Sequence, residues 1–232
     1  MGSGGLIERL LRLYSGLFLY GVALALLIHA HLGIDPWDVL HQGIARHLHI
    51  AIGTVTIAVG AIVLVLWIPL RQRPGLGTVS NVVLVGLIMN LMLGWLPVPH
   101  ALVPRIVELV LAIPLCALAS GLYIGSSLGP GPRDGLMTGL SRQRGLSIRA
   151  TRAAIELTVL VSGWLLGGNV GIGTVLYALT IGPLVQFTLH HLTVVPPGAG
   201  EHSAAGEDHA ATDIPAELDL IPRHGLDITG SG

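Results

Sequence analysis

Five long stretches of this 232-residue chain contain no Asp, Glu, Lys or Arg, and they limit what it can fold into. They cover residues 13–34, 47–70, 74–104, 109–132 and 157–200. Each stretch can hold the roughly 20 apolar residues that a helix needs to cross a bilayer core of about 30 Å. Only 11% of the residues are charged, against about a quarter in soluble domains. The chain is therefore predicted to be an all-α integral membrane protein.

The last stretch is long enough for two spans, which Gly167, Gly168 and Asn169 separate. The first span also resembles a secretory signal, because Arg9 and Arg12 precede it. Its apolar region exceeds the usual ~7–15 residues and has no clear cleavage site, so we expect it to be retained. Six transmembrane helices are expected, near residues 13–31, 50–70, 76–96, 102–125, 148–166 and 171–192.

An internal repeat is the second constraint on the fold. Residues 32–93 align without a gap with residues 128–189, and 19 of the 62 pairs are identical. Chance would give about six identities, judged from average residue usage. Each copy holds three spans, and this odd number makes the second copy enter the membrane from the opposite side, as in many secondary transporters. We therefore expect two inverted three-helix repeats, in membrane regions 13–96 and 97–193.

Arginines orient these two regions, because cytoplasmic loops of membrane proteins are enriched in basic residues. Arg71 and Arg73 follow the second span of the first copy, whereas Arg142 and Arg144 follow the first span of the second copy. Both pairs are expected in the cytoplasm of a bacterium, together with the N-terminus, 1–12, and the C-terminus. Residues 194–232 carry seven acids and one Arg, and are predicted to form a disordered acidic tail.

A short segment that begins with proline lies between the first two spans of each copy, at 36–48 and 132–144. A helix of about 12 residues rises only ~18 Å, so each is expected to be interfacial or re-entrant. Asp38 and Asp134 fall in the first turn, where a carboxylate interacts favourably with the helix N-terminus. Helix capping is the simpler role. The alternative is that inverted symmetry brings both carboxylates to a central cavity, for cation binding or proton relay.

A Gly-x-Gly-Thr motif opens the third span of each copy. Glycine allows a tight turn and Thr can cap the helix that follows. Alternatively, the backbone N–H groups could hold an anionic group. Capping is favoured, and the lack of a following Lys argues against a nucleotide loop. The motif residues are Gly75, Gly77 and Thr78 in the first copy and Gly171, Gly173 and Thr174 in the second.

The fifth span begins with three charged residues, Arg149, Arg152 and Glu156, at helical spacing i, i+3 and i+7. This stripe either faces the bundle interior or reaches the cytoplasmic headgroups, with Glu156 paired to Arg152. Asn81 and Asn90 are expected to form hydrogen bonds between helices, with a pathway role as the alternative. The candidate residues of a substrate or ion pathway are therefore Asp38, Asp134, Arg149, Arg152, Glu156, Asn81 and Asn90.

Several histidines cluster near the outer end of the first span. Imidazole binds metals and titrates near neutral pH, but the three in the short segment do not recur in the second copy. A wet interfacial loop is the favoured interpretation, and neither a metal site nor a cofactor is predicted. The clustered residues are His29, His31, His41, His47 and His49.

The runs LGIDPWDVL, at 32–40, and PGLGTVSN, at 74–81, resemble the bacterial YczE family, which groups with YyaS and YitT-like membrane proteins. The resemblance covers residues of about 10 to 190. The second copy departs from it, with Arg133 at the place of Trp37 and Tyr177 at that of Asn81. The resemblance implies a multi-span protein of the bacterial cytoplasmic membrane, and it brings no substrate.

Three classes of function fit these features. A small-solute secondary transporter or exporter is favoured; the alternatives are a membrane-embedded binding or regulatory subunit of a larger complex, and a channel. An enzyme is not expected, because no metal-ligand helix, nucleophile elbow or pair of catalytic acids is present. The expected partners are the lipid bilayer and an unknown small solute, with a homo-oligomer or a partner protein left open. Nucleic acid is not expected.

Overall fold

The computed structural model describes residues 5–97 and 101–192, and this part of the chain is all helical. Both short helices have proline as their first residue, where the missing N–H costs nothing. The acidic tail lies outside the described residues. The helices are α1 (Leu6–His29), α2 (Pro36–Leu48), α3 (Ile52–Trp67), α4 (Leu76–Trp95), α5 (Leu102–Gly125), α6 (Pro132–Arg144), α7 (Ile148–Leu165) and α8 (Ile172–Leu192).

All six expected spans and both short segments are helices, but not all six have the length and composition of a membrane span. Among the described residues, α1, α4, α5 and α8 are long and apolar enough to cross, and α2 with α3 form a fifth candidate, bent by 115°. Helix α3 has 16 residues and so rises only about 24 Å. Helix α7 has 18 residues, and three of them are charged.

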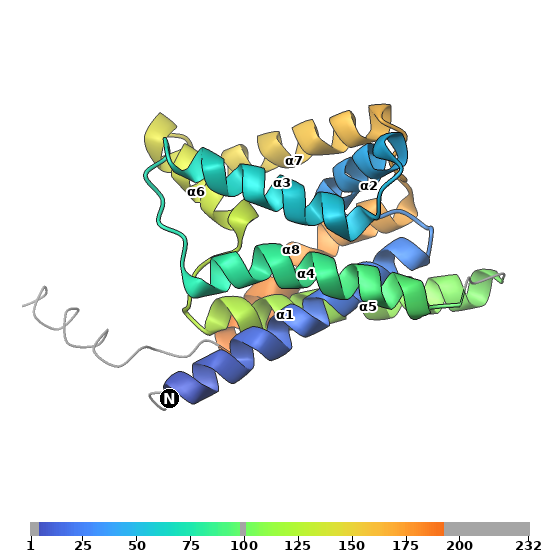
Figure 1. The fold of residues 1–232 in the computed structure, drawn as a ribbon, viewed down its shortest axis with the longest axis horizontal. Coiled ribbons are helices and arrows are strands. Elements are labelled where there is room, and N and C mark those ends of the chain that lie inside the picture. The colour runs from blue at the N-terminus through green and yellow to red at the C-terminus, as the bar shows by residue number, and fades with distance from the viewer. Residues whose placement is uncertain (1–4, 98–100, 193–232) are drawn as a thin grey trace, which may run out of the picture. The chain divides into compact units, whose positions relative to one another are not determined.

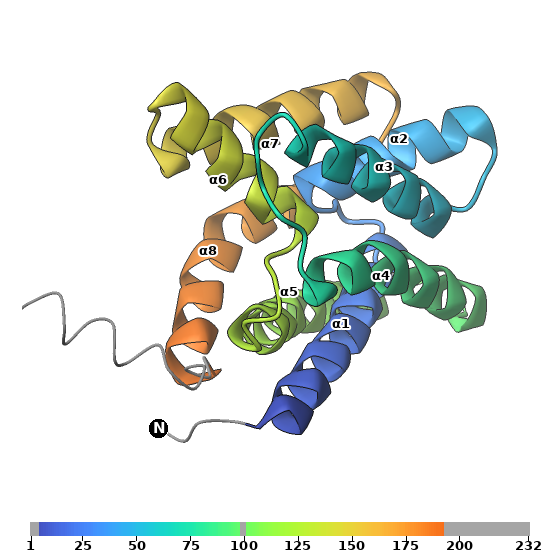
Figure 2. The ribbon, with the colours of Figure 1, turned by 60° about the vertical axis from the view of Figure 1, so that its left-hand side comes forward.

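The helices lie in two groups (Figure 1). Helix α1 packs against α4 and α5, and α5 packs against α8, so the four long helices form one layer. The four shorter helices form the other layer, in which α2 contacts α3 and α7, and α6 contacts the same two helices. Figure 2 shows the same division from a second direction. The layers are joined mainly where α3 packs along α4.

Helix α1 is the central helix of the long layer. Leu13, Leu17, Leu24 and Leu27 are fully buried and pack with apolar residues of α4, α5 and α8. Gly16 allows a close approach, since a Cβ at this position would lie 2.7 Å from the backbone nitrogen of a residue in α5. The buried face of α1 is therefore part of the folded core, while Leu11, Tyr14 and Phe18 on its other face are exposed.

Residues related by the offset of 96 make equivalent contacts across the two copies. The N–H of Gly77 donates to the carbonyl of Leu128 at 2.9 Å, and the N–H of Gly173 donates to the carbonyl of Leu32 at 2.8 Å. Each carbonyl precedes a glycine in the left-handed region, with φ of +111° or +129°, where other residues are strained. The start of the third span in each copy thus contacts the first loop of the other copy.

The packing of α3 on α4 has no equivalent between α7 and α8 in the described part of the chain. Gly53 and Gly86 meet where α3 crosses α4, and a Cβ on Gly86 would lie 2.6 Å from Cγ1 of Ile57. Gly182, the equivalent of Gly86 on α8, has no described atom within 4 Å of such a Cβ. The position equivalent to Gly53 is Arg149, which cannot allow a close helix contact. The two halves therefore share a sequence pattern and differ in packing.

Candidate functional site

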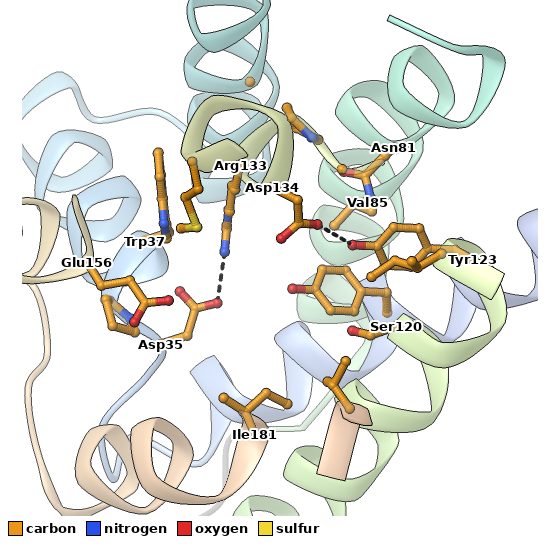
Figure 3. Close-up of a pocket in the computed structure, with 18 of the residues that line it drawn as sticks. Asp35, Trp37, Asn81, Val85, Ser120, Tyr123, Arg133, Asp134, Glu156 and Ile181 are labelled. Carbon is orange, nitrogen blue, oxygen red and sulfur yellow. Dashed lines mark hydrogen bonds and ion pairs between the residues drawn. The ribbon is translucent and has the colours of Figure 1, made fainter. Parts of the chain in front are cut away.

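A cavity of about 320 Å³ lies between the layer of long helices and the layer of short helices. Figure 3 shows its residues converging from both layers. The long helices contribute rings and small polar groups, among them Tyr20, Asn81, Ser120, Tyr123 and Tyr177. The short helices contribute most of the charge, with Asp35, Arg133, Asp134, Arg152 and Glu156. Ligand sites in proteins are concave and mostly apolar with a few polar groups placed in this way.

The N-terminal ends of α2 and α6 meet at this cavity. Asp35 caps α2, because its Oδ1 accepts the backbone N–H of Asp38 at 2.7 Å. Its other oxygen, Oδ2, lies 3.1 Å from Nη1 of Arg133, the second residue of α6 (Figure 3). The guanidinium of Arg133 also lies over the ring of Trp37, 5.2 Å from its centre, in a cation–π contact. Trp37 and Arg133 occupy equivalent positions in the two copies.

Asp38 is fully buried and lies behind this ion pair, outside the cavity lining. Its Oδ1 is 2.9 Å from Nδ1 of His41 and 3.6 Å from Nη2 of Arg133, while Oδ2 has no described hydrogen-bond partner. His41 in turn lies 3.2 Å from the hydroxyl of Thr56 on α3. Capping of α2 is therefore done by Asp35, and Asp38 belongs to a buried polar chain that reaches the cavity through His41.

Asp134 lines the cavity, as the hypothesis of a central site requires. The hydroxyl of Tyr123 on α5 donates to its Oδ2 at 3.4 Å (Figure 3). The N-cap position of α6 is Gly131, which makes no side-chain hydrogen bond. Asp38 and Asp134 are equivalent in sequence, yet Asp38 is fully buried and Asp134 lines the cavity.

The charged stripe of α7 is divided. Arg152 and Glu156 line the cavity and form the predicted pair, with Nε of Arg152 2.8 Å from Oε1 of Glu156. Arg149 is exposed and lies outside the lining. A second space of about 230 Å³ shares most of its lining with the main cavity and lies between α7 and α8, next to Gly182. The cavity thus continues sideways where α7 and α8 are separated.

The Gly-x-Gly-Thr motifs have the predicted local geometry. The hydroxyl of Thr78 accepts the N–H of Gly75 at 3.2 Å, and Thr174 accepts the N–H of Gly171 at 3.3 Å. Each threonine therefore satisfies a free donor at the start of its helix. Thr78 also donates to the carbonyl of Pro130 at 2.8 Å, which joins α4 to the loop before α6.

The two asparagines differ in position. Asn81 lines the cavity. Asn90 lies outside the lining, and its Oδ1 accepts the N–H of Gly53 at 2.8 Å, which makes it the interhelical hydrogen-bonding residue expected from the sequence. Its equivalent, Gln186, lines the cavity instead, because in the described residues α7 does not pack on α8 as α3 packs on α4.

The histidines do not share one environment, so the wet-loop interpretation is wrong for two of them. His29 and His41 are buried and each lies beside a carboxylate, His29 at 2.9 Å from Oε2 of Glu108. His31, His47 and His49 are exposed. In the described residues no group of three or more His, Cys, Asp or Glu side chains could hold a metal ion.

Sequence reasoning did not select Asp35, Trp37, Arg133 or the cavity tyrosines as site residues. The position equivalent to Asp35 in the second copy is Gly131, so Asp35 is not among the acids that occur in both copies. Trp37 and Arg133 were visible only as a departure between the copies. The useful signal is that a large aromatic residue and a cation occupy equivalent positions in the two copies, each beside the start of a helix that begins with proline.

The family profile that matches residues 7–190 is described as a family of unknown function, DUF6198. The chain belongs to this family. It is 31% identical over 178 residues to the uncharacterized membrane protein YczE of Bacillus subtilis, covering 76% of this chain and 83% of that protein. It is also 39% identical over 180 residues to an uncharacterized protein of Haemophilus influenzae, covering 78% and 83%. These relatives bear out the YczE resemblance, and no solved structure matches.

Proposed function

We propose that this DUF6198 protein is a non-enzymatic secondary transporter of the bacterial cytoplasmic membrane, built from two inverted repeats. The observation that carries the proposal is the cavity between the layers, where the starts of the equivalent helices α2 and α6 meet. Many secondary transporters bind substrate near the midplane, at the interface between repeats and beside the ends of short helices.

The charged residues that line the cavity support this proposal. Ionisable side chains are costly at membrane depth, where they mark substrate or ion pathways. The Asp35–Arg133 and Arg152–Glu156 pairs both border the cavity. The polar chain from Asp38 through His41 also reaches it.

The unequal packing of the two halves indicates to which side of the membrane the cavity opens in this conformation. Gln186 and Leu189, near the C-terminal end of α8, line the cavity, whereas the equivalent end of α4 is covered by α3 at Gly53 and Asn90. The arginine distribution puts the end of α8 on the cytoplasmic side. We therefore assign this conformation as open toward the cytoplasm and closed by α3 and α4 toward the outside.

Labelling of one engineered cysteine tests the proposal. Cys116 is the only native cysteine and is buried, so Cys116→Ser provides the background for Ser120→Cys on the cavity wall. A membrane-impermeant thiol reagent should label Ser120→Cys from the cytoplasmic side of inverted vesicles and, more slowly, from the outside of spheroplasts. Leu179→Cys, on the exposed face of the same layer, is the control and should react poorly from both sides.

The labelling pattern separates the candidate classes. Labelling of Ser120→Cys from both sides, slower from the outside and reduced when the cavity is open to the cytoplasm, supports alternating access. Equal and simultaneous access from both sides points to a channel. Labelling from one side only, under every condition, contradicts transport and favours a binding subunit.

A further inference from the structure

Asp134 differs from the other acids of the cavity because, among the described residues, no basic side chain forms a salt bridge with it. Oδ2 of Asp35 lies 3.1 Å from Arg133, and Oε1 of Glu156 lies 2.8 Å from Arg152. Among the described residues no Arg or His forms an ion pair with Asp134 within 4.0 Å. Arg152 and Arg133 attract it only from a longer distance, and its hydrogen bonds come from the hydroxyl of Tyr123, at 3.4 Å, and the backbone of Gly131. A half-buried carboxylate that faces an open space is a binding group for a positively charged ligand.

The aromatic walls of the cavity suit an organic cation. Rings of Tyr20, Tyr123 and Tyr177 border the cavity, and Tyr20 meets Tyr123 edge to face with centres 5.8 Å apart. Aromatic faces attract ammonium ions. The indole N–H of Trp37 is buried at the lining and has no described partner, so a second polar group of a ligand can be satisfied there.

The rest of the lining suits an apolar body. Val82 and Val85 of α4, Ile181 of α8 and Met137 of α6 all line the space. A volume of about 320 Å³ is at the lower end of the range for small-molecule sites, which fits a one-ring molecule. A bare metal cation needs several oxygen or nitrogen ligands, and no such cluster occurs in the described residues.

We infer that the cavity binds an organic ammonium ion with an apolar body, whose nitrogen pairs with Asp134 beside Tyr123. The inference rests on the proposed transport function, because it names the class of substrate for the same cavity. The sideways opening between α7 and α8 gives such an amphiphile a way in beside Gly182.

Binding of three matched probes to the purified full-length protein in detergent tests this inference. Calorimetric titration with phenethylamine, 2-phenylethanol and phenylacetate compares a cation, a neutral molecule and an anion with the same ring. Phenethylamine should bind at least 10-fold more tightly than 2-phenylethanol. Asp134→Asn should weaken phenethylamine binding by about 10- to 100-fold, as expected for a charge-assisted hydrogen bond, and leave 2-phenylethanol binding unchanged.

Two further variants keep the result interpretable. Glu8→Gln removes one acid at a surface pair with Arg12, outside the cavity, and should change neither affinity. Asp134→Glu should retain the preference for the amine, which separates loss of charge from misfolding. Equal affinity for amine and alcohol in the wild-type protein, or an unchanged amine affinity in Asp134→Asn, overturns the inference.

The inference and the proposed function can fail separately. Two-sided labelling of Ser120→Cys without any preference for phenethylamine leaves the transporter standing and removes the substrate class. A strong preference for the amine that depends on Asp134, together with labelling from one side only, would support the binding site and contradict transport.

Discussion

Equivalent glycines on α4 and α8 should respond differently to the same substitution. Gly86 lies against α3, where a Cβ would come within 2.6 Å of Cγ1 of Ile57 and closer still to the carbonyl oxygen of Gly53. Gly182 faces open space. Replacing glycine by alanine inside a helix adds about 0.5–1 kcal/mol of stability, and this gain is common to both sites. It therefore cancels when the two variants are compared.

The remaining difference is the cost of overpacking at one site. Forcing an extra carbon into a close-packed contact typically costs about 1–3 kcal/mol. Gly86→Ala should thus be less stable than Gly182→Ala by about 1–3 kcal/mol, and Gly182→Ala should be at least as stable as the wild type. Reversible unfolding in mixed micelles, followed by circular dichroism, gives both free energies of unfolding.

Gly94→Ala, at another position on α4 where a Cβ meets nothing within 4 Å, calibrates the gain from alanine alone. Equal effects at Gly86 and Gly182 would refute the reasoning, because they would mean that the two glycines are packed equally closely. A loss of stability at Gly182 alone would reverse the assignment of the open and closed halves.

Two other predictions use the same unfolding assay. Asp35→Ala should lower the free energy of unfolding by about 3–5 kcal/mol, because it leaves Arg133 without its carboxylate and removes the cap of α2. Adding Arg133→Leu should recover much of this loss, and no recovery would argue against the ion pair. Thr78→Val should cost about 1 kcal/mol more than Thr174→Val, since Thr78 also donates to the carbonyl of Pro130; equal costs would argue against that bond.

Much of the local structure could be read from the sequence. Charge-free runs, prolines and glycines mark the helix positions, because lipid-exposed backbone must be hydrogen-bonded within a helix. The paired Gly-x-Gly-Thr motifs also have the predicted capping role. Offset-related contacts such as Gly77 to Leu128 and Gly173 to Leu32 follow the repeat seen in the sequence.

The site itself was harder to predict, because its main contacts join residues far apart in the chain. Helical spacing places Arg149, Arg152 and Glu156 on one face of α7. It does not predict that the cavity reaches Arg152 and Glu156 but not Arg149. His41 lies three residues after Asp38, a spacing at which helical side chains meet, so its burial beside that acid was within reach of the sequence. The pairing of Asp35 with Arg133, 98 residues away, depends on how the two halves pack.

The most direct test of the account compares two equivalent positions in the short helices. His47 near the end of α2 and Gln143 near the end of α6 are separated by 96 residues, and both are exposed. In the Cys116→Ser background, an impermeant thiol reagent should label His47→Cys only from outside the cell and Gln143→Cys only from the cytoplasm. Labelling of both from the same side would contradict the inverted repeat, and with it the proposed mode of transport.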